Sequence, residues 1–153
     1  MKTLKQHINE ALKIGKNLSE WSAYSCQPKT KGELIEIIRK RISKEGTNCD
    51  LNDIDTSLIK YMPFLFCGAN FNGDISRWNV SNVEDMSYMF DHSNFNCDIS
   101  KWNVSKVEDM SFMFERSKFN KDISNWKINK DCNTDDMFAN CYIKDEYKPV
   151  LPK

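Results

Sequence analysis

A 24-residue repeat occupies most of the second part of this chain. Its two clearest copies are residues 71–94, FNGDISRWNVSNVEDMSYMFDHSN, and residues 95–118, FNCDISKWNVSKVEDMSFMFERSK. The same period continues without insertion through 119–142 and backwards through a less regular copy at 47–70. A unit of this length cannot bury its apolar face alone, so it predicts stacked neighbours that share one interior. We therefore expect a solenoid of four coils, used as a binding scaffold and not as an enzyme.

Apolar residues recur at fixed positions of the repeat and predict its interior. In residues 71–94 these positions are Ile75, Trp78, Val80, Val83, Met86, Met89 and Phe90. The Ile-Ser-x-Trp-x-Val part is β-branched and aromatic, which is typical of a strand that pairs with its copies about 4.8 Å away. The Val-x-x-Met-x-x-Met-Phe part has a spacing near three, which is typical of a tight helical or 3₁₀ turn. The repeat thus predicts the α+β class.

Two helices are expected before the repeats. The apolar face of the first, over residues 3–15, would consist of Leu4, Ile8, Ala11 and Leu12. Thr30 and Glu33 form a capping-box pattern that begins the second, and Gly46 ends it. Its buried face would consist of Leu34, Ile37, Ile38 and Ile42. Because an open stack must cover its ends, we predict a helical N-terminal cap at 1–46, repeats at 47–70, 71–94, 95–118 and 119–142, and a C-terminal tail at 143–153.

Composition limits the partners and the compartment. The 153 residues have zero formal net charge, which gives no general attraction to nucleic acid or anionic lipid. No apolar run is long enough for a signal peptide or a membrane span. The six cysteines are irregularly spaced and contain no Cys-x-x-Cys, which predicts reduced, mostly buried thiols. We expect a cytoplasmic protein that contacts neither nucleic acid nor membrane directly, and the oligomeric state stays open.

Every unit contains an Asn followed two residues later by an Asp. These columns are Asn48, Asn72, Asn96 and Asn120, and Asp50, Asp74, Asp98 and Asp122. Calcium uses such oxygens, but each coil supplies only two of them. We therefore expect a structural ladder that satisfies backbone groups at a corner of each coil, with no metal.

The sequence predicts no catalytic residue and no cofactor. His7 and His92 are the only histidines, and no nucleophile motif accompanies either of them. The five glycines are dispersed and form no phosphate-binding loop.

Three tryptophans, Trp78, Trp102 and Trp126, are aligned in the repeat. They would form a stacking stripe for sugars if they faced solvent, which makes a carbohydrate-binding or adhesion-type repeat module the alternative function. Their apolar flanks, and Ile54 at the same position in the first unit, favour burial instead.

We expect the partner-binding residues at repeat positions whose residue type changes from unit to unit, while the apolar positions stay the same. If Trp78 points inward, its two neighbours in the strand point outward. The outward stripe then consists of Asp53, Asp55, Arg77, Asn79, Lys101, Asn103, Asn125 and Lys127. It changes from acidic to basic along the stack, which suits a protein partner; a merely solvated face is the alternative. The opposite turn face, with His92 and Arg116, is the second candidate surface.

The repeat consensus, Phe-Asn-x-Asp-Ile-Ser-x-Trp-x-Val-Ser-x-Val-x-x-Met-x-x-Met-Phe, resembles that of the BspA-like leucine-rich-repeat proteins, a domain-of-unknown-function group. The resemblance covers residues 47–142. It implies a short open stack of coils used for binding, with no catalytic residues. The expected architecture is therefore a leucine-rich-repeat solenoid of four 24-residue coils behind a two-helix cap.

The first eleven residues, MKTLKQHINEA, resemble the capsid-targeting peptide of internal head proteins in T-even-type phages. Those peptides begin with Met-Lys-Thr and end in (Leu/Ile)-x-Glu before a small residue, where a maturation protease cuts. The resemblance implies a processing site between Glu10 and Ala11. An amphipathic capping helix would use similar residues. The favoured function is a non-enzymatic protein-interaction module. The resemblance of the first eleven residues implies that it is phage-encoded, is delivered from a phage head to the host cytoplasm and occludes a host defence protein.

Overall fold

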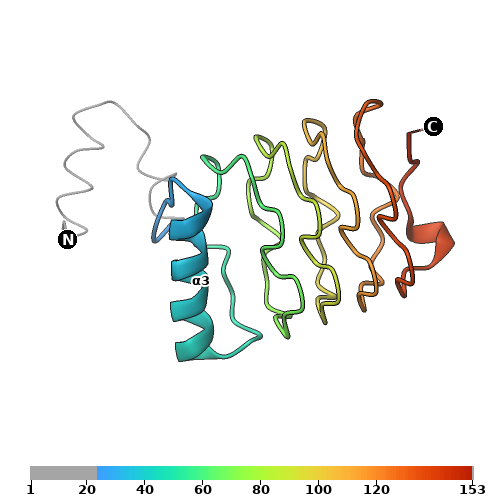
Figure 1. Cartoon of the computed structure of the whole chain (residues 1–153). Helices are drawn as coiled ribbons and strands as arrows, with labels where there is room; N and C mark the ends of the chain where they lie inside the picture. The colour runs from blue at the N-terminus through green and yellow to red at the C-terminus, as the bar shows by residue number, and fades with distance from the viewer. Residues whose placement is uncertain (1–23, 153) are drawn as a thin grey trace.

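The computed structural model describes residues 24–152, which form a row of stacked coils behind one α-helix (Figure 1). The helix, α3, spans Lys31–Glu45, and a short 3₁₀ helix, η1, spans Asp145–Tyr147 near the other end of the row. We call the repeat units 47–70, 71–94, 95–118 and 119–142 coils 1 to 4. In residues 24–152, neither helix has the length and apolar character needed to cross a membrane.

The second predicted helix is confirmed as α3. The Thr30 hydroxyl accepts a hydrogen bond from the Glu33 amide at 3.2 Å, and Gly46, at φ 87°, follows the last turn. Leu34 and Ile38 are buried, and the helix lies across the end of the row of coils (Figure 1). The helix predicted over residues 3–15 falls outside the described residues.

The predicted α+β solenoid with a two-helix cap is wrong. Residues 24–152 contain one α-helix and no strand, and coils meet through isolated parallel bridges such as Asp50–Asp74 and Asp85–Asp109. Tight turns prevent strands from forming. In coil 2, amides donate to carbonyls three residues earlier, as Trp78 does to Ile75, Val83 to Val80 and Met89 to Met86. Each of these turns reverses the chain before an extended segment can grow, so the segment predicted as a strand is a turn-rich corner.

The predicted interior is confirmed. All seven apolar positions of coil 2 are buried, and the same columns are buried in coil 3. Phenylalanine rings form the centre: Phe90 stacks on Phe95 with centroids 4.3 Å apart, and Phe114 on Phe119 at 4.4 Å. Because the apolar core runs without a break from Leu34 in α3 to Ile143, the coils share one interior.

In coils 1 to 3, the second half of each coil bonds to the next coil through its backbone. In coil 2, the amides of Met86, Tyr88, Phe90 and His92 donate to carbonyls of coil 3 at 2.8–3.0 Å. Tyr88 and His92 are held at φ 56° and 52°, and the equivalent residues of every coil also have positive φ. Bulky residues rarely adopt this conformation, which costs about 1–2 kcal/mol each. The repeated hydrogen bonds between coils offset that cost.

Candidate basic edge of the stack

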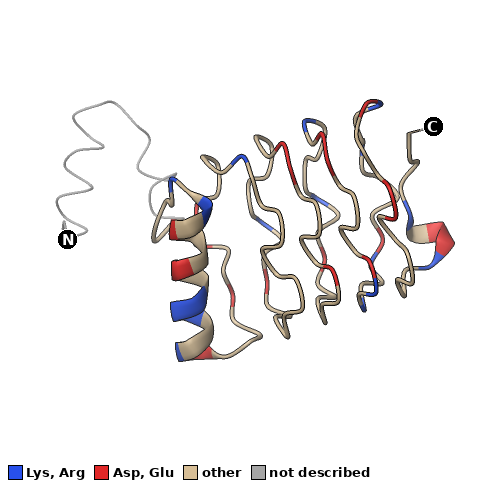
Figure 2. Ribbon diagram, in the orientation of Figure 1, with Lys and Arg blue, Asp and Glu red and all other residues tan. Residues whose placement is uncertain are grey.

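The corner segments of coils 2 to 4 surround a shallow hollow of about 460 Å³. Three exposed cations line it, Arg77 from coil 2, Lys101 from coil 3 and Lys121 from coil 4. We call these three residues the basic edge. Figure 2 shows that Lys, Arg, Asp and Glu occur along all the coils. The net charge of the chain is zero because positive and negative residues are equal in number, not because charged residues are few.

Two carboxylates, Asp74 and Asp98, also line the hollow, and the backbone holds both of them. Asp98 accepts a hydrogen bond from the Ser100 amide at 2.9 Å, and bonds from Ser100 lower the pKa of its carboxyl group. Burial acts to raise the pKa of Asp74, but hydrogen bonds from Asn52 and Ser76 outweigh it, and the pKa is lowered overall. Both groups are thus anions at neutral pH, and three cations against two anions leave one net positive charge at the hollow.

The asparagine column joins coils 2, 3 and 4 and the segment after them, whereas coil 1 is joined to coil 2 by the Asn72 amide, which donates to the Thr47 carbonyl at 2.9 Å. The Asn96 amide donates to Asn72 Oδ1 and the Asn120 amide to Asn96 Oδ1, both at 2.8 Å. Asn120 Oδ1 in turn accepts from the Lys144 amide at 3.1 Å.

The aspartate column acts within each coil instead. Asp50, Asp74, Asp98 and Asp122 each accept the amide of the residue two positions later at 2.8–2.9 Å. Seven of the eight predicted ladder residues therefore bind the backbone through a side-chain oxygen; the eighth, Asn48, is exposed, and its side chain makes no hydrogen bond within residues 24–152. Within residues 24–152 no three His, Cys, Asp or Glu side chains are grouped as metal ligands would be.

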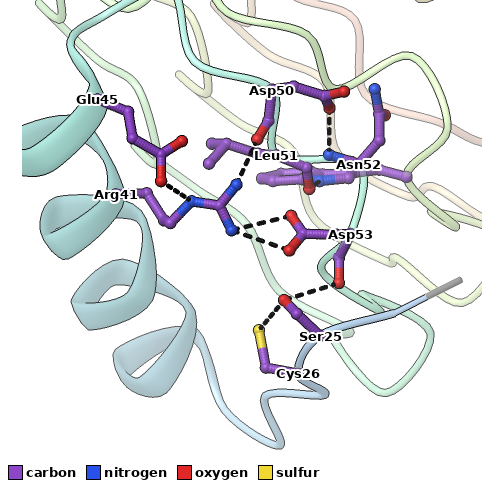
Figure 3. Close-up of polar contacts among 9 residues, drawn as sticks. Ser25, Cys26, Arg41, Glu45, Asp50, Leu51, Asn52 and Asp53 are labelled. Carbon is purple, nitrogen blue, oxygen red and sulfur yellow. Dashed lines mark hydrogen bonds and ion pairs between the residues drawn. The ribbon is translucent and has the colours of Figure 1, made fainter. Parts of the chain in front are cut away.

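The structure does not present the acidic end of the predicted stripe to a partner. Arg41 of α3 donates to both carboxylate oxygens of Asp53, at 3.0 and 2.9 Å, and to the Asp50 carbonyl at 2.8 Å (Figure 3). Asp55 accepts a hydrogen bond from Gln27 Nε2 at 2.6 Å. Asp53 and Asp55 are therefore bound by Arg41 of α3 and by Gln27, which precedes the helix. The predicted stripe that changes from acidic to basic is not available as one continuous surface for a partner.

Electrostatics reinforce the contact between Arg41 and Asp53. The hydrogen bond to Asp53 raises the pKa of Arg41. Burial acts to raise the pKa of Asp53, but hydrogen bonds from Arg41 and Ser25 and the charge of Arg41 lower it overall. Glu45 adds a second carboxylate 3.1 Å from Arg41 Nε (Figure 3). This network fastens α3 to coil 1.

The remaining residues of the predicted stripe divide into two groups. Asn79 and Asn103 accept hydrogen bonds from the hydroxyls of Ser81 and Ser105, at 2.7 and 2.8 Å, and stabilise local turns. Asn125 donates to the Ser100 carbonyl at 3.0 Å. The other three, Arg77, Lys101 and Lys127, are exposed cations, and two of them line the hollow.

Sequence reasoning missed Lys121. It occupies the middle position of the Asn-x-Asp motif, which holds Gly73 in coil 2 and Cys97 in coil 3. That column varies between two constant neighbours, and this variation was the signal that could have identified it. Cys97 also lines the hollow, and burial raises the pKa of its thiol, so it is a protonated and weakly nucleophilic group at neutral pH.

The tryptophan column is buried, with 3–4% of each side chain exposed. Each indole N–H donates to a carbonyl of the preceding coil: Trp78 to Leu51 at 2.9 Å, Trp102 to Ile75 at 3.1 Å and Trp126 to Ile99 at 3.2 Å. These rings have no face available to stack on a sugar, so the observation behind the carbohydrate-binding alternative is absent.

Residues 38–148 match the model of a family described as Mycoplasma protein of unknown function, DUF285. The chain belongs to this family. The DUF285 family is related to the BspA-like repeat proteins, which agrees with the resemblance of residues 47–142. The match begins within α3 and extends beyond coil 4, so it includes the basic edge. No curated protein and no solved structure matches the chain.

Proposed function

We propose that this member of the DUF285 family is a non-enzymatic protein-interaction module that binds an acidic surface of its partner through the basic edge. The supporting observation is the hollow itself, where exposed cations from three successive coils converge on one site. Arg77 and Lys101 lie within turns closed by hydrogen bonds from the Trp78 amide to the Ile75 carbonyl and from the Trp102 amide to the Ile99 carbonyl, so little backbone order has to be gained on binding.

A protein partner suits this surface better than nucleic acid does. Proteins that bind DNA through its backbone neutralise about 6–10 phosphates in many cases. The basic edge supplies three cations next to two carboxylates, in a chain of zero net charge. Such a mixed surface favours discrimination among protein partners by charge complementarity.

The resemblance of residues 1–11 to a capsid-targeting peptide supports a narrower proposal, in which the partner is a host defence protein and the module occludes it. Delivery from a phage head would bring the module into the host cytoplasm with the phage DNA. This proposal predicts that the protein recovered from phage particles begins at Ala11, because the protease would cut after Glu10. An intact Met1 terminus on virion protein, measured by mass spectrometry, would refute the processing step.

The binding proposal is tested by capture from host lysate with quantitative mass spectrometry. The test variant carries Arg77→Glu and Lys101→Glu, and the control carries Lys130→Glu and Lys144→Glu, an equal charge change at exposed lysines that do not line the hollow. We expect the control to retain the same partner as the parent chain and the test variant to lose it. Equal capture by all three proteins would refute the proposal.

A further inference from the structure

A ladder of three stacked aromatic rings lies outside the apolar core. Phe64 stacks on Tyr88 with centroids 4.6 Å apart, and Tyr88 stacks on Phe112 at 4.7 Å. We call these residues the aromatic ladder. Phe64 is 56% exposed, and Tyr61, three residues earlier, is 54% exposed. Since interior packing does not require these rings, they form a surface feature that the basic edge does not explain.

The ladder ends at coil 4, where Asp136 takes the place of the fourth ring. Phe64, Tyr88, Phe112 and Asp136 occupy the same position of the repeat, with φ between 51° and 58°. Each ring residue donates its amide to the carbonyl one position earlier in the next coil, and Phe112 donates in this way to Asp135 at 2.9 Å. The backbone therefore places Asp136 in line with the rings, so a carboxylate follows the last aromatic face.

The surroundings of this last position are acidic. Asp136 and its neighbour Asp135 are exposed, and within residues 24–152 neither carboxylate has a hydrogen bond or an ion pair. The cation nearest to Asp136 in sequence, Lys130, has its Nζ 4.0 Å from a carboxylate oxygen of Asp131. The cation nearest to Phe112, Arg116, is directed elsewhere, since its Nε lies 3.5 Å from Glu115 and its Nη1 lies 3.3 Å from His92 Nε2. An aromatic face beside carboxylates without partners is the environment that a guanidinium group recognises, by stacking on the ring and pairing with the acid.

We propose that the aromatic ladder binds an arginine-containing segment of a partner protein, whose guanidinium takes the place of the missing fourth ring. It would stack on the free face of Phe112 and pair with Asp136. The aliphatic part of that segment would lie along the edges of Tyr88 and Phe64. Lysine is a poorer fit, because its ammonium is not planar and holds its water more strongly. This site does not include any residue of the basic edge. The proposal can therefore be confirmed or refuted whatever the outcome of the test of the basic edge.

The test is a titration of the ¹⁵N-labelled protein, followed by amide chemical shifts, with the peptide acetyl-Gly-Leu-Arg-Leu-Gly-amide. Two matched peptides carry lysine or neutral citrulline in place of arginine. We expect saturable shifts centred on Phe112 and Asp136, with binding at least tenfold weaker for citrulline and several-fold weaker for lysine. Similar binding of the arginine and citrulline peptides, or shifts spread evenly over all acidic residues, would overturn the proposal.

Two substitutions sharpen the test. Asp136→Asn removes the charge and should weaken binding of the arginine peptide at least threefold. Asp136→Tyr should abolish it by filling the fourth position, and Tyr88 already shows that a ring is accommodated in this backbone conformation. Glu36→Gln, at an exposed acid on α3, is the control and should leave binding of the arginine peptide unchanged.

Unchanged binding of the arginine peptide to Asp136→Asn would overturn the proposal even if Asp136→Tyr failed to fold. Shifts at Phe112 that depend on protein concentration without peptide would identify a second copy of the chain as the occupant and would likewise overturn it.

Discussion

Coils 2 and 3 have nearly the same interior and different edges. Ile75 and Ile99, Trp78 and Trp102, and Phe90 and Phe114 are equivalent pairs, and all six are buried. Outside the apolar core, the buried Gly73 is replaced by the partly buried Cys97, and on the surface His92 is replaced by Arg116. The comparison indicates that the interior columns determine stability, whereas the outer columns are available for recognition. Substitutions in the two sets should therefore have separable effects.

The largest effect is expected in the interior. Phe114→Ala removes a fully buried ring that stacks on Phe90, Phe119 and Phe138, and it should reduce the free energy of unfolding by about 3–5 kcal/mol. Phe112→Ala, two residues earlier, removes a partly exposed ring and should cost much less. Urea unfolding measures both. Equal losses would show that the interior and the surface do not differ as described.

A second prediction compares one column in two coils. A Cβ added to Gly73 would overlap the Cys49 carbonyl oxygen, because the Asp74 amide bonds to that same oxygen at 3.2 Å and holds the two backbones close together. Gly73→Ala should therefore destabilise the protein by about 1–3 kcal/mol, since the backbone of coil 1 has to move. Cys97→Ala, at the equivalent position of coil 3, should be close to neutral. Thermal melting of both variants checks the difference, and an unaffected Gly73→Ala variant would contradict the close approach of coils 1 and 2.

A smaller effect is expected where α3 contacts coil 1. Asp53→Asn removes the ion pair with Arg41, which is partly exposed, so the loss should be about 1 kcal/mol. Because folding lowers the pKa of Asp53, its contribution is fully present above the ordinary carboxyl pKa of about 3.9. It is lost as the pH falls through the lower pKa of the folded state. The stability difference between parent and variant should thus be constant from pH 5 to 7 and shrink below pH 4. A difference that grows on acidification would contradict this assignment.

The repeat made the interior predictable from the sequence, because the same apolar residues return every 24 positions. Thr30 and Gly46 likewise predicted the ends of α3. The strands were predicted wrongly, because the residues that favour strands are interrupted by corners at which Asp74 and its equivalents bind the backbone. Propensity alone does not reveal such a corner.

The basic edge was partly predictable and the aromatic ladder was not. Arg77 and Lys101 were identified from a variable column, but the pairing of Asp53 with Arg41 depends on how α3 crosses the stack. Tyr88 and Phe112 each lie between a serine and a methionine, and in the sequence they resemble further core residues. The positive φ that turns them outward is a property of the folded coil. The one indication in the sequence was Asp136, because a charged residue in place of the aromatic one suggests that this repeat position lies at the surface.

The most direct test measures stability and capture on the same three proteins: the parent chain, the Arg77→Glu/Lys101→Glu variant and Phe112→Ala. Surface changes away from caps and cores usually alter stability by about 0.5 kcal/mol or less. We predict that the charge-reversal variant unfolds at the same urea concentration as the parent and no longer captures the partner that depends on the basic edge. We predict that Phe112→Ala still captures that partner. A charge-reversal variant that captures the partner normally, or that loses capture only because it has unfolded, would contradict the separation of a stabilising interior from a binding edge.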